Sequence, residues 1–174
     1  VNDAPTTGNK TLSATEDTAY IFSSDNFSFS DVEGDNISKV KITTLESAGT
    51  LYVDADNDDT YDSGEDVTLN QEVAISNIAN LQFIAASNAN GTSYATFGFK
   101  VSDGIAWSES AGTITINVAA VNDAPTAVNK TLSAAEDTVY TFSSSDFLFS
   151  DVDGDSISKI KITTLENAGT LYVD

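Results

Sequence analysis

Apolar and polar residues alternate with a period of two along several short segments, the pattern of β-strands with one buried face. In residues 113–118, for example, Ile114, Ile116 and Val118 share one side and polar residues share the other. Asp, Asn, Gly and Ser bound these segments and predict turns. Short helical turns are plausible at residues 24–27 and 75–78. The predicted strands are residues 11–14, 19–22, 39–45, 50–53, 67–69, 81–84, 97–101 and 113–118. About seven strands in one domain indicate an all-β sandwich.

The chain contains a long tandem repeat. Residues 1–54 and 121–174 are identical at 42 of 54 positions when they are aligned with an offset of 120. This period exceeds the roughly 20 to 50 residues of solenoid units and matches one self-contained domain. We therefore predict a complete sandwich repeat at 1–120 and the N-terminal part of a second, truncated repeat at 121–174. Because the chain has no Met, we expect it to come from within a longer polypeptide.

The charge of the chain is strongly one-sided. Asp and Glu number 27 against 7 Lys and Arg, for a net charge of −20 with no His. Such a charge excludes nucleic acid as a partner and disfavours anionic membrane surfaces. No apolar run approaches the roughly 18 residues of a membrane span, so no direct membrane insertion is expected. Without His or Cys, nucleophiles and general bases are few, and we predict that the protein is not an enzyme.

Acidic residues gather in loops that the strand order would bring together. If successive strands reverse direction, three loops lie at the same end of the domain as the N-terminus. They are the loop before the third strand, the loop at 54–66 and the Ser-Asp-Gly turn. Crowded like charges favour a cation there. Asp-Gly and Asn-Asp turns would explain the same residues without a metal. The candidate ligands at this end are Asn2, Asp3, Asp31, Glu33, Asp35 and Asp103, and those at the opposite end are Glu16 and Asp17.

Four motifs occur in a fixed order: VNDAP at the start of each copy, EDT at 16–18, Asp-x-Glu/Asp-Gly-Asp at 31–35 and 151–155, and Ser-Asp-Gly at 102–104. In this order they resemble cadherin-like tandem repeats of large bacterial surface adhesins, in an RTX-type extender region. The resemblance covers nearly the whole chain. It implies an Ig-like or cadherin-like Greek-key fold with Ca²⁺ between successive repeats. The implied ligands are Asn122, Asp123, Asp151, Asp153 and Asp155, with Glu16 and Asp17 from the preceding repeat. Ala120 and Ala124 stand where the animal linker has ligands, which implies a weaker or single-ion junction.

The segment 54–65 resembles a 12-residue calcium loop. Oxygen ligands stand at positions 1, 3, 5, 7, 9 and 12, namely Asp54, Asp56, Asp58, Thr60 through its carbonyl, Asp62 and Glu65. Hard oxygen ligands suit Ca²⁺, whereas Mg²⁺ needs a tighter octahedron and transition metals favour imidazole or thiolate. Position 6, usually Gly, is Asp59, and no helices are predicted on either side. The alternative interpretation is a solvated, anti-aggregation surface or a halophilic adaptation.

These features predict a Ca²⁺-binding extender repeat of an extracellular, cell-surface bacterial adhesin that projects a distal binding domain. Its expected partners are neighbouring repeats of the same chain. The alternative is a carbohydrate-binding cadherin-like module with a glycan partner. Trp107 and the tyrosines Tyr52, Tyr61 and Tyr94, expected to be exposed, could stack on sugars.

Overall fold

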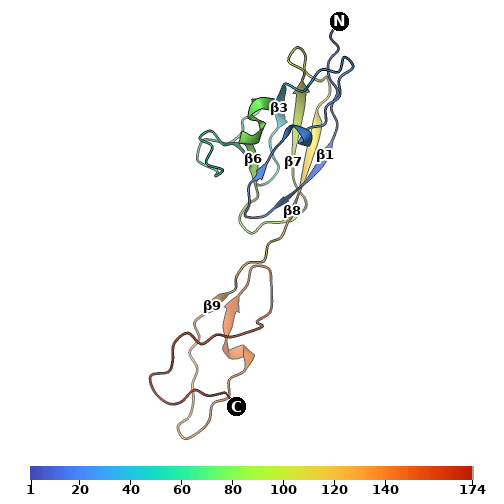
Figure 1. Ribbon diagram of the computed structural model, residues 1–174. Helices are drawn as coiled ribbons and strands as arrows, with labels where there is room; N and C mark the ends of the chain where they lie inside the picture. The colour runs from blue at the N-terminus through green and yellow to red at the C-terminus, as the bar shows by residue number, and fades with distance from the viewer. Residues whose placement is uncertain (174) are drawn as a thin grey trace. The chain divides into compact units, whose positions relative to one another are not determined.

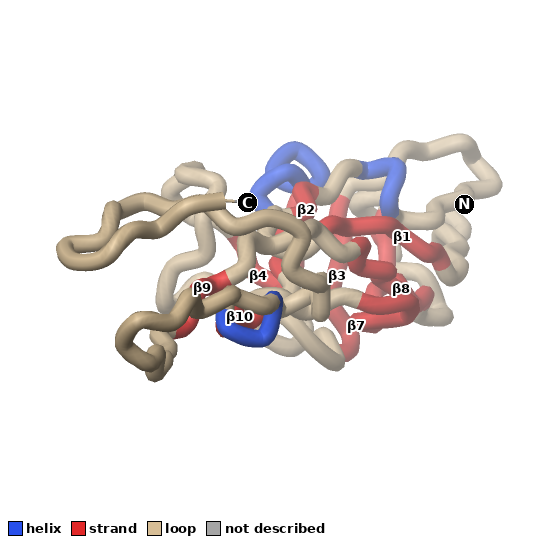
Figure 2. Tube along the Cα trace, turned by 90° about the horizontal axis from the view of Figure 1, so that it is seen from below, coloured by secondary structure: helices blue, strands red, loops and turns tan. Residues whose placement is uncertain are grey.

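The computed structural model describes residues 1–173. The chain divides into two compact units, Val1–Val121 and Asn122–Asp174, here called unit 1 and unit 2. This division lies within one residue of the predicted repeat boundary. Most strands belong to unit 1, whereas unit 2 consists mainly of loops (Figures 1 and 2). Within residues 1–173, no helix has the length and apolar character needed to cross a bilayer.

Unit 1 contains a five-stranded sheet with the order β1-β8-β7-β3-β5. Strand β1 runs parallel to β8, and each of the other neighbouring pairs is antiparallel. Because β3 runs opposite to β7, the loop before β3 and the turn after β7 meet at the same end of the sheet. The strands are β1 (Lys10–Thr15), β3 (Lys39–Thr44), β5 (Glu72–Ala74), β7 (Gly91–Ser102) and β8 (Gly112–Ala119).

A second sheet in unit 1 has three strands in the order β2-β6-β4 and lies beside the first in Figure 1. These strands are β2 (Tyr20–Ile21), β4 (Thr50–Val53) and β6 (Leu81–Ile84), and the two 3₁₀ helices are η1 (Ser24–Asn26) and η2 (Ile75–Asn80). The predicted all-β class and both predicted helical turns are confirmed. The Ig-like Greek-key assignment stays a prediction.

Alternating residues from both sheets form one apolar core. Val40 and Ile42 of β3 are fully buried, as are Ile114 and Ile116 of β8, which explains their period of two. The ring of Phe99 meets that of Phe27 edge-on, with the centroids 5.1 Å apart. Burial of each such side chain contributes about 1.5–3 kcal/mol relative to exposure, and this burial holds the two sheets together.

The strand predicted at residues 67–69 is wrong. Asp66 forms a single bridge with Tyr52, and the chain then turns through Asn70, whose φ of 66° lies in the left-handed region. The N–H group of Gln71 closes this turn by donating to the Thr68 carbonyl at 3.0 Å. The unpredicted strand β5 follows the turn and pairs with β3, so unit 1 still has eight strands, as many as the segments predicted.

Unit 2 forms few regular elements although its sequence repeats residues 1–54. They are β9 (Thr126–Val128), η3 (Ser144–Asp146) and β10 (Leu148–Ser150). The pair Thr126 and Ser150 in unit 2 matches the bridge between Thr6 and Ser30 in unit 1. In unit 1, the strands from residues 1–54 pair with strands from residues 72–119, and no copy of that later segment follows within the described residues of unit 2.

Candidate metal centre

The loop at residues 54–66 leaves the end of β4 and returns to it at the bridge between Tyr52 and Asp66. Its curvature depends on left-handed residues, with φ of 62° at Asn57, 59° at Asp59 and 105° at Gly64. Asn, Asp and Gly tolerate this conformation better than other residues. Asp59, at the position where calcium loops usually carry Gly, therefore supplies the sharp turn itself.

Asp54 organises the loop from its base. Its side chain is only 2% exposed and accepts N–H groups from three residues of the loop. Oδ1 accepts from Asn57 at 2.7 Å and from Asp58 at 3.3 Å, and Oδ2 accepts from Asp59 at 3.0 Å. These hydrogen bonds wrap residues 57–59 around a buried carboxylate.

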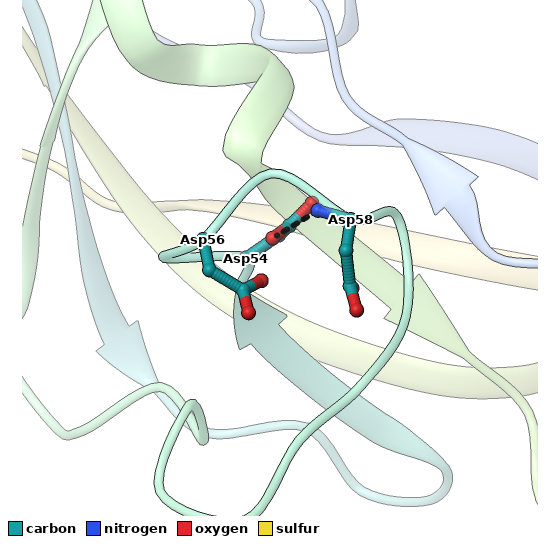
Figure 3. A group of neighbouring side chains, drawn as sticks. All are labelled: Asp54, Asp56 and Asp58. Atoms are coloured by element: carbon teal, nitrogen blue, oxygen red, sulfur yellow. Dashed lines mark hydrogen bonds between the residues drawn. The ribbon is translucent and has the colours of Figure 1, made fainter.

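Three carboxylates converge inside this loop. Oxygen atoms of Asp54, Asp56 and Asp58 all lie within 4.8 Å of one another, and Figure 3 shows the three side chains inside the curve of the loop. Oxygens bound to one Ca²⁺ at about 2.4 Å can be at most about 4.8 Å apart, so this spacing suits a shared ion. Asp54 is buried, whereas Asp56 and Asp58 are exposed. The trio combines a fixed inner carboxylate with two carboxylates that are accessible from solvent.

The charges in the trio act on one another. The charge of Asp58 raises the pKa of the Asp56 carboxyl above its ordinary value. The opposite shift occurs at Asp58, where hydrogen bonds from the Thr60 hydroxyl and N–H, at 2.6 and 2.8 Å, lower the pKa. Asp58 is thereby held as a carboxylate, and Asp56 experiences the resulting repulsion. A bound cation would relieve that repulsion.

Gln82 of β6 supports the trio from the core, and sequence reasoning missed it. Its side chain is fully buried; Nε2 donates to Asp54 Oδ2 at 3.3 Å and to Asp59 Oδ1 at 3.2 Å. Its Oε1 accepts the Tyr52 hydroxyl at 2.9 Å. The available signal was a glutamine between Leu81 and Phe83 in an otherwise apolar strand. Buried polar residues of this kind need partners, and here the partners lie in the loop.

The remaining predicted loop ligands play other parts in this structure. Glu65 ties the loop closed, since Oε1 accepts the Ala55 N–H at 2.7 Å and Oε2 accepts the Asp62 N–H at 2.9 Å. Thr60 donates both its hydroxyl and its N–H to Asp58. Asp62 is exposed and accepts the Glu65 N–H through its carbonyl at 3.3 Å. Of the six predicted ligands, the structure therefore brings three together.

A second acidic cluster lies at the end of unit 1 that carries the N-terminus. Asn2 Nδ2 donates to Asp103 Oδ2 at 3.0 Å, and the Asp3 N–H donates to Glu33 at 3.3 Å. The N-terminal residues, the loop before β3 and the Ser-Asp-Gly turn thus meet at one end, as predicted, but these contacts do not include the loop at 54–66, which was predicted to join them. Asp31 Oδ1 accepts the N–H groups of Glu33 and Asp35 at 3.0 and 3.2 Å. Its Oδ2 is buried without a hydrogen-bond partner among residues 1–173.

This second cluster is separate from the carboxylate trio. Within the described part of the chain, no hydrogen bond joins residues 54–66 to Asp31 or Asp103. Two N–H groups, of Ile105 and Ala106, donate to Asp103 at 2.7 Å each. The Ala106 bond and the amide of Asn2 lower the pKa of Asp103. This carboxylate is held in its charged form by protein donors.

Glu16 lies at the opposite end of unit 1, where its buried side chain is hydrogen-bonded by the protein itself. It is 1% exposed; Oε1 accepts the Val121 N–H at 2.6 Å and Oε2 accepts Asn90 Nδ2 at 3.1 Å. The Glu16 N–H in turn donates to the Ala119 carbonyl at 3.0 Å. Glu16 therefore fastens the last residues of unit 1 to the β1–β2 turn. Asp17 is exposed in the same turn, with a φ of 57°.

Unit 2 repeats the local geometry of the N-terminal cluster. The Asp123 N–H donates to Asp153 Oδ2 at 2.7 Å, as Asp3 does to Glu33. The Asp155 N–H donates to Asp151 at 2.9 Å, and the Asn122 amide donates to the Asp123 carbonyl at 2.9 Å. These contacts are local, and so they form in unit 2 without the later strands.

The aromatic residues proposed for sugar binding are mostly covered. The expectation that Tyr52 is exposed is wrong, because its side chain is fully buried beneath the loop and hydrogen-bonded to Gln82. Lys41 Nζ lies 4.2 Å from the ring centroid of the half-buried Trp107. Tyr94 is half-buried, with its hydroxyl accepting the Ala86 N–H at 3.1 Å. Tyr61, 39% exposed, is the most accessible of the four.

Comparisons with protein-family models, curated proteins and solved structures found no match for this chain. The resemblance to cadherin-like repeats therefore stays a prediction based on the sequence motifs. What the structure adds is an all-β unit with three converging Asp side chains that could hold a metal ion.

Proposed function

We propose that the protein is a calcium-binding spacer repeat of an extracellular bacterial adhesin, in which bound Ca²⁺ stabilises an acidic β-unit so that it can hold a distal binding domain away from the cell. The convergence of Asp54, Asp56 and Asp58 within 4.8 Å is the observation that supports it most directly. The adhesin context rests on the tandem repeat and on the motif resemblance.

The chemistry of the donors favours Ca²⁺ over other ions. All three ligands are carboxylate oxygens, and the chain offers neither His nor Cys to a transition metal. Ca²⁺ accepts six to eight oxygens in flexible geometry, whereas Mg²⁺ requires a near-ideal octahedron. Two of the three carboxylates are exposed, which leaves room for water and further loop oxygens to complete the irregular shell of Ca²⁺.

A bound ion would stabilise the compact form of such a unit, which a spacer requires. A chain of net charge −20 repels itself when compact, and a cation in the trio offsets part of that repulsion. An ion that binds only the folded state also stabilises it by mass action, by about 2.7 kcal/mol at a free concentration 100 times the Kd. Extracellular calcium modules bind at about 10⁻⁴–10⁻³ M, so such a repeat would be stiffened outside the cell. Rigidification between repeats is the part of the proposal that rests on the resemblance alone.

Thermal unfolding of the full chain in Ca²⁺, in Mg²⁺ and in chelator tests this proposal. We expect Ca²⁺ to raise the melting temperature well above the chelated value and Mg²⁺ to raise it less. Asp58→Asn should remove most of the Ca²⁺ increment, whereas Glu109→Gln, an equal charge change at an exposed residue of the β7–β8 connection, should keep it. Equal melting temperatures in all three buffers would contradict the proposal.

A glycan array on the same protein in Ca²⁺ separates the spacer from the carbohydrate-binding alternative. We expect no specific signal. A sugar signal that Tyr61→Ala or Trp107→Ala abolishes would favour the carbohydrate-binding module instead.

A further inference from the structure

Unit 2 exposes apolar side chains that are buried in unit 1. Ile160, Ile162, Leu171 and Tyr172 are 49%, 52%, 40% and 60% exposed. Their counterparts 120 residues earlier, Val40, Ile42, Leu51 and Tyr52, are each 0% exposed. The difference cannot come from the side chains, since three of the four pairs are identical and the fourth is Val against Ile. It comes from what packs against them.

In unit 1 these residues pair with strands from the later part of the repeat. Val40 pairs with Val101 and Ile42 with Phe99, both on β7. Leu51 pairs with Phe83 on β6. Each of these paired strands comes from residues 55–121, here called the second-half segment. Residues 1–54 thus contribute one part of a core that the second-half segment completes.

Unit 2 retains all the apolar residues that residues 1–54 contribute to the core of unit 1. Eight apolar residues of the core of unit 1 come from residues 1–54, and in unit 2 seven are identical and one is changed from Val to Ile. Several differences between the copies fall at exposed sites instead, such as Ile21, which becomes Thr141. The retained core residues of unit 2 are Leu132, Ala134, Phe142, Phe147, Ile160, Ile162, Leu171 and Tyr172.

We propose that these eight apolar residues form a docking surface for a polypeptide equivalent to the second-half segment, Ala55–Val121. The occupant would add its strands to unit 2 as β5 to β8 add to unit 1: antiparallel to residues 159–164 and parallel to residues 130–135. Specificity comes from two sources. The strand register would place apolar residues opposite partners, and residues 130–135 and 159–164, which form no strand in unit 2, would gain strand hydrogen bonds.

A lengthened chain tests this proposal directly. A copy of residues 55–121 is fused after Asp174, and amide hydrogen exchange is compared between the original and lengthened chains. We expect the amides of residues 160–162 and 171–172 to exchange slowly in the lengthened chain, by about 1,000-fold or more relative to the original, as amides of a stable domain core do. Residues 40–42 and 51–52 serve as the internal reference, because unit 1 is present in both proteins.

A second extension of the same length controls for protection that any added polypeptide would give to unit 2. It carries Phe99→Asp and Ile114→Asp in the added copy only, which removes two core side chains and leaves the length unchanged. The proposal is overturned if residues 160–172 stay unprotected in the lengthened chain, or if the control extension protects them equally. It is also overturned if these residues are already protected in the original chain in a concentration-dependent way, since a second copy would then be the occupant.

Discussion

Replacement of Gln82 by Leu tests whether the carboxylate trio depends on the core. Leu is similar in volume to Gln and fits an apolar strand, so the change removes hydrogen bonds while it leaves packing largely intact. Two consequences follow from the structure. The Tyr52 hydroxyl loses its acceptor, and Asp54 and Asp59 lose their only side-chain donor from β6 among the described residues.

The expected cost can be worked from these bonds. An orphaned buried hydroxyl costs about 1–3 kcal/mol. A hydrogen bond to a charged group contributes about 1.5–3 kcal/mol, and the bond from Gln82 Nε2 to Asp54 belongs at the lower end because it is 3.3 Å long. We therefore expect Gln82→Leu to lower the free energy of unfolding of unit 1 by about 2.5–4.5 kcal/mol in chelator. Loss of a supporting residue also predicts Ca²⁺ affinity about 10–100-fold weaker.

Urea unfolding in chelator measures the stability, and a double-mutant cycle with Tyr52→Phe isolates the hydroxyl. Because Tyr52→Phe removes the orphaned group, the double variant should be more stable than Gln82→Leu alone. A cost below about 0.5 kcal/mol, the range of ordinary surface substitutions, would refute the reasoning. So would strict additivity of the two changes.

Two further predictions concern single carboxylates. Glu16→Ala should lower stability by about 1–3 kcal/mol, equally with and without Ca²⁺, because it leaves the Val121 N–H without its acceptor; a loss seen only in Ca²⁺ would instead make Glu16 a metal ligand. Asp56→Asn should stabilise the chelated protein at neutral pH and weaken Ca²⁺ binding. The folded-state pKa of Asp56 is raised, so its contribution to stability is present below the usual value of about 3.9 and is lost as the pH rises through the raised pKa. Urea midpoints of the two proteins should accordingly converge in acid, and a constant difference across pH would contradict this origin.

Alternation of apolar residues was enough to predict most of unit 1. Residues 50–53 and 81–84 are strands with the predicted bounds, because each short segment has strong β-formers between clear turn residues. The segment 67–69 failed because a left-handed Asn70 and the Thr68–Gln71 turn redirect the chain before a strand can form. The local pattern of residues cannot show which short segment will pair with another strand. Residues 72–74 form β5 because they pair with the edge of β3 that β7 leaves open.

The sequence predicted the parts of the candidate site that depend on residue spacing in the loop. It did not predict the parts that depend on contacts between residues far apart in the chain. Alternate residues from Asp54 to Asp58 face one point because the loop curves around them. The role of Gln82 could not be inferred from spacing, since it is 28 residues from Asp54 in the chain. The burial of Tyr52 also depends on tertiary contact, because Tyr61 of the loop that follows packs edge-on against its ring, with the centroids 5.4 Å apart.

Isothermal titration of Ca²⁺ into the full chain is the most direct test of the central claim that the carboxylate trio binds calcium. We predict saturable binding with a Kd in the micromolar to millimolar range, with a much weaker response to Mg²⁺. Asp54→Asn should abolish this binding and Glu109→Gln should leave it unchanged. No heat at millimolar Ca²⁺, or an unchanged isotherm for Asp54→Asn, would contradict the account.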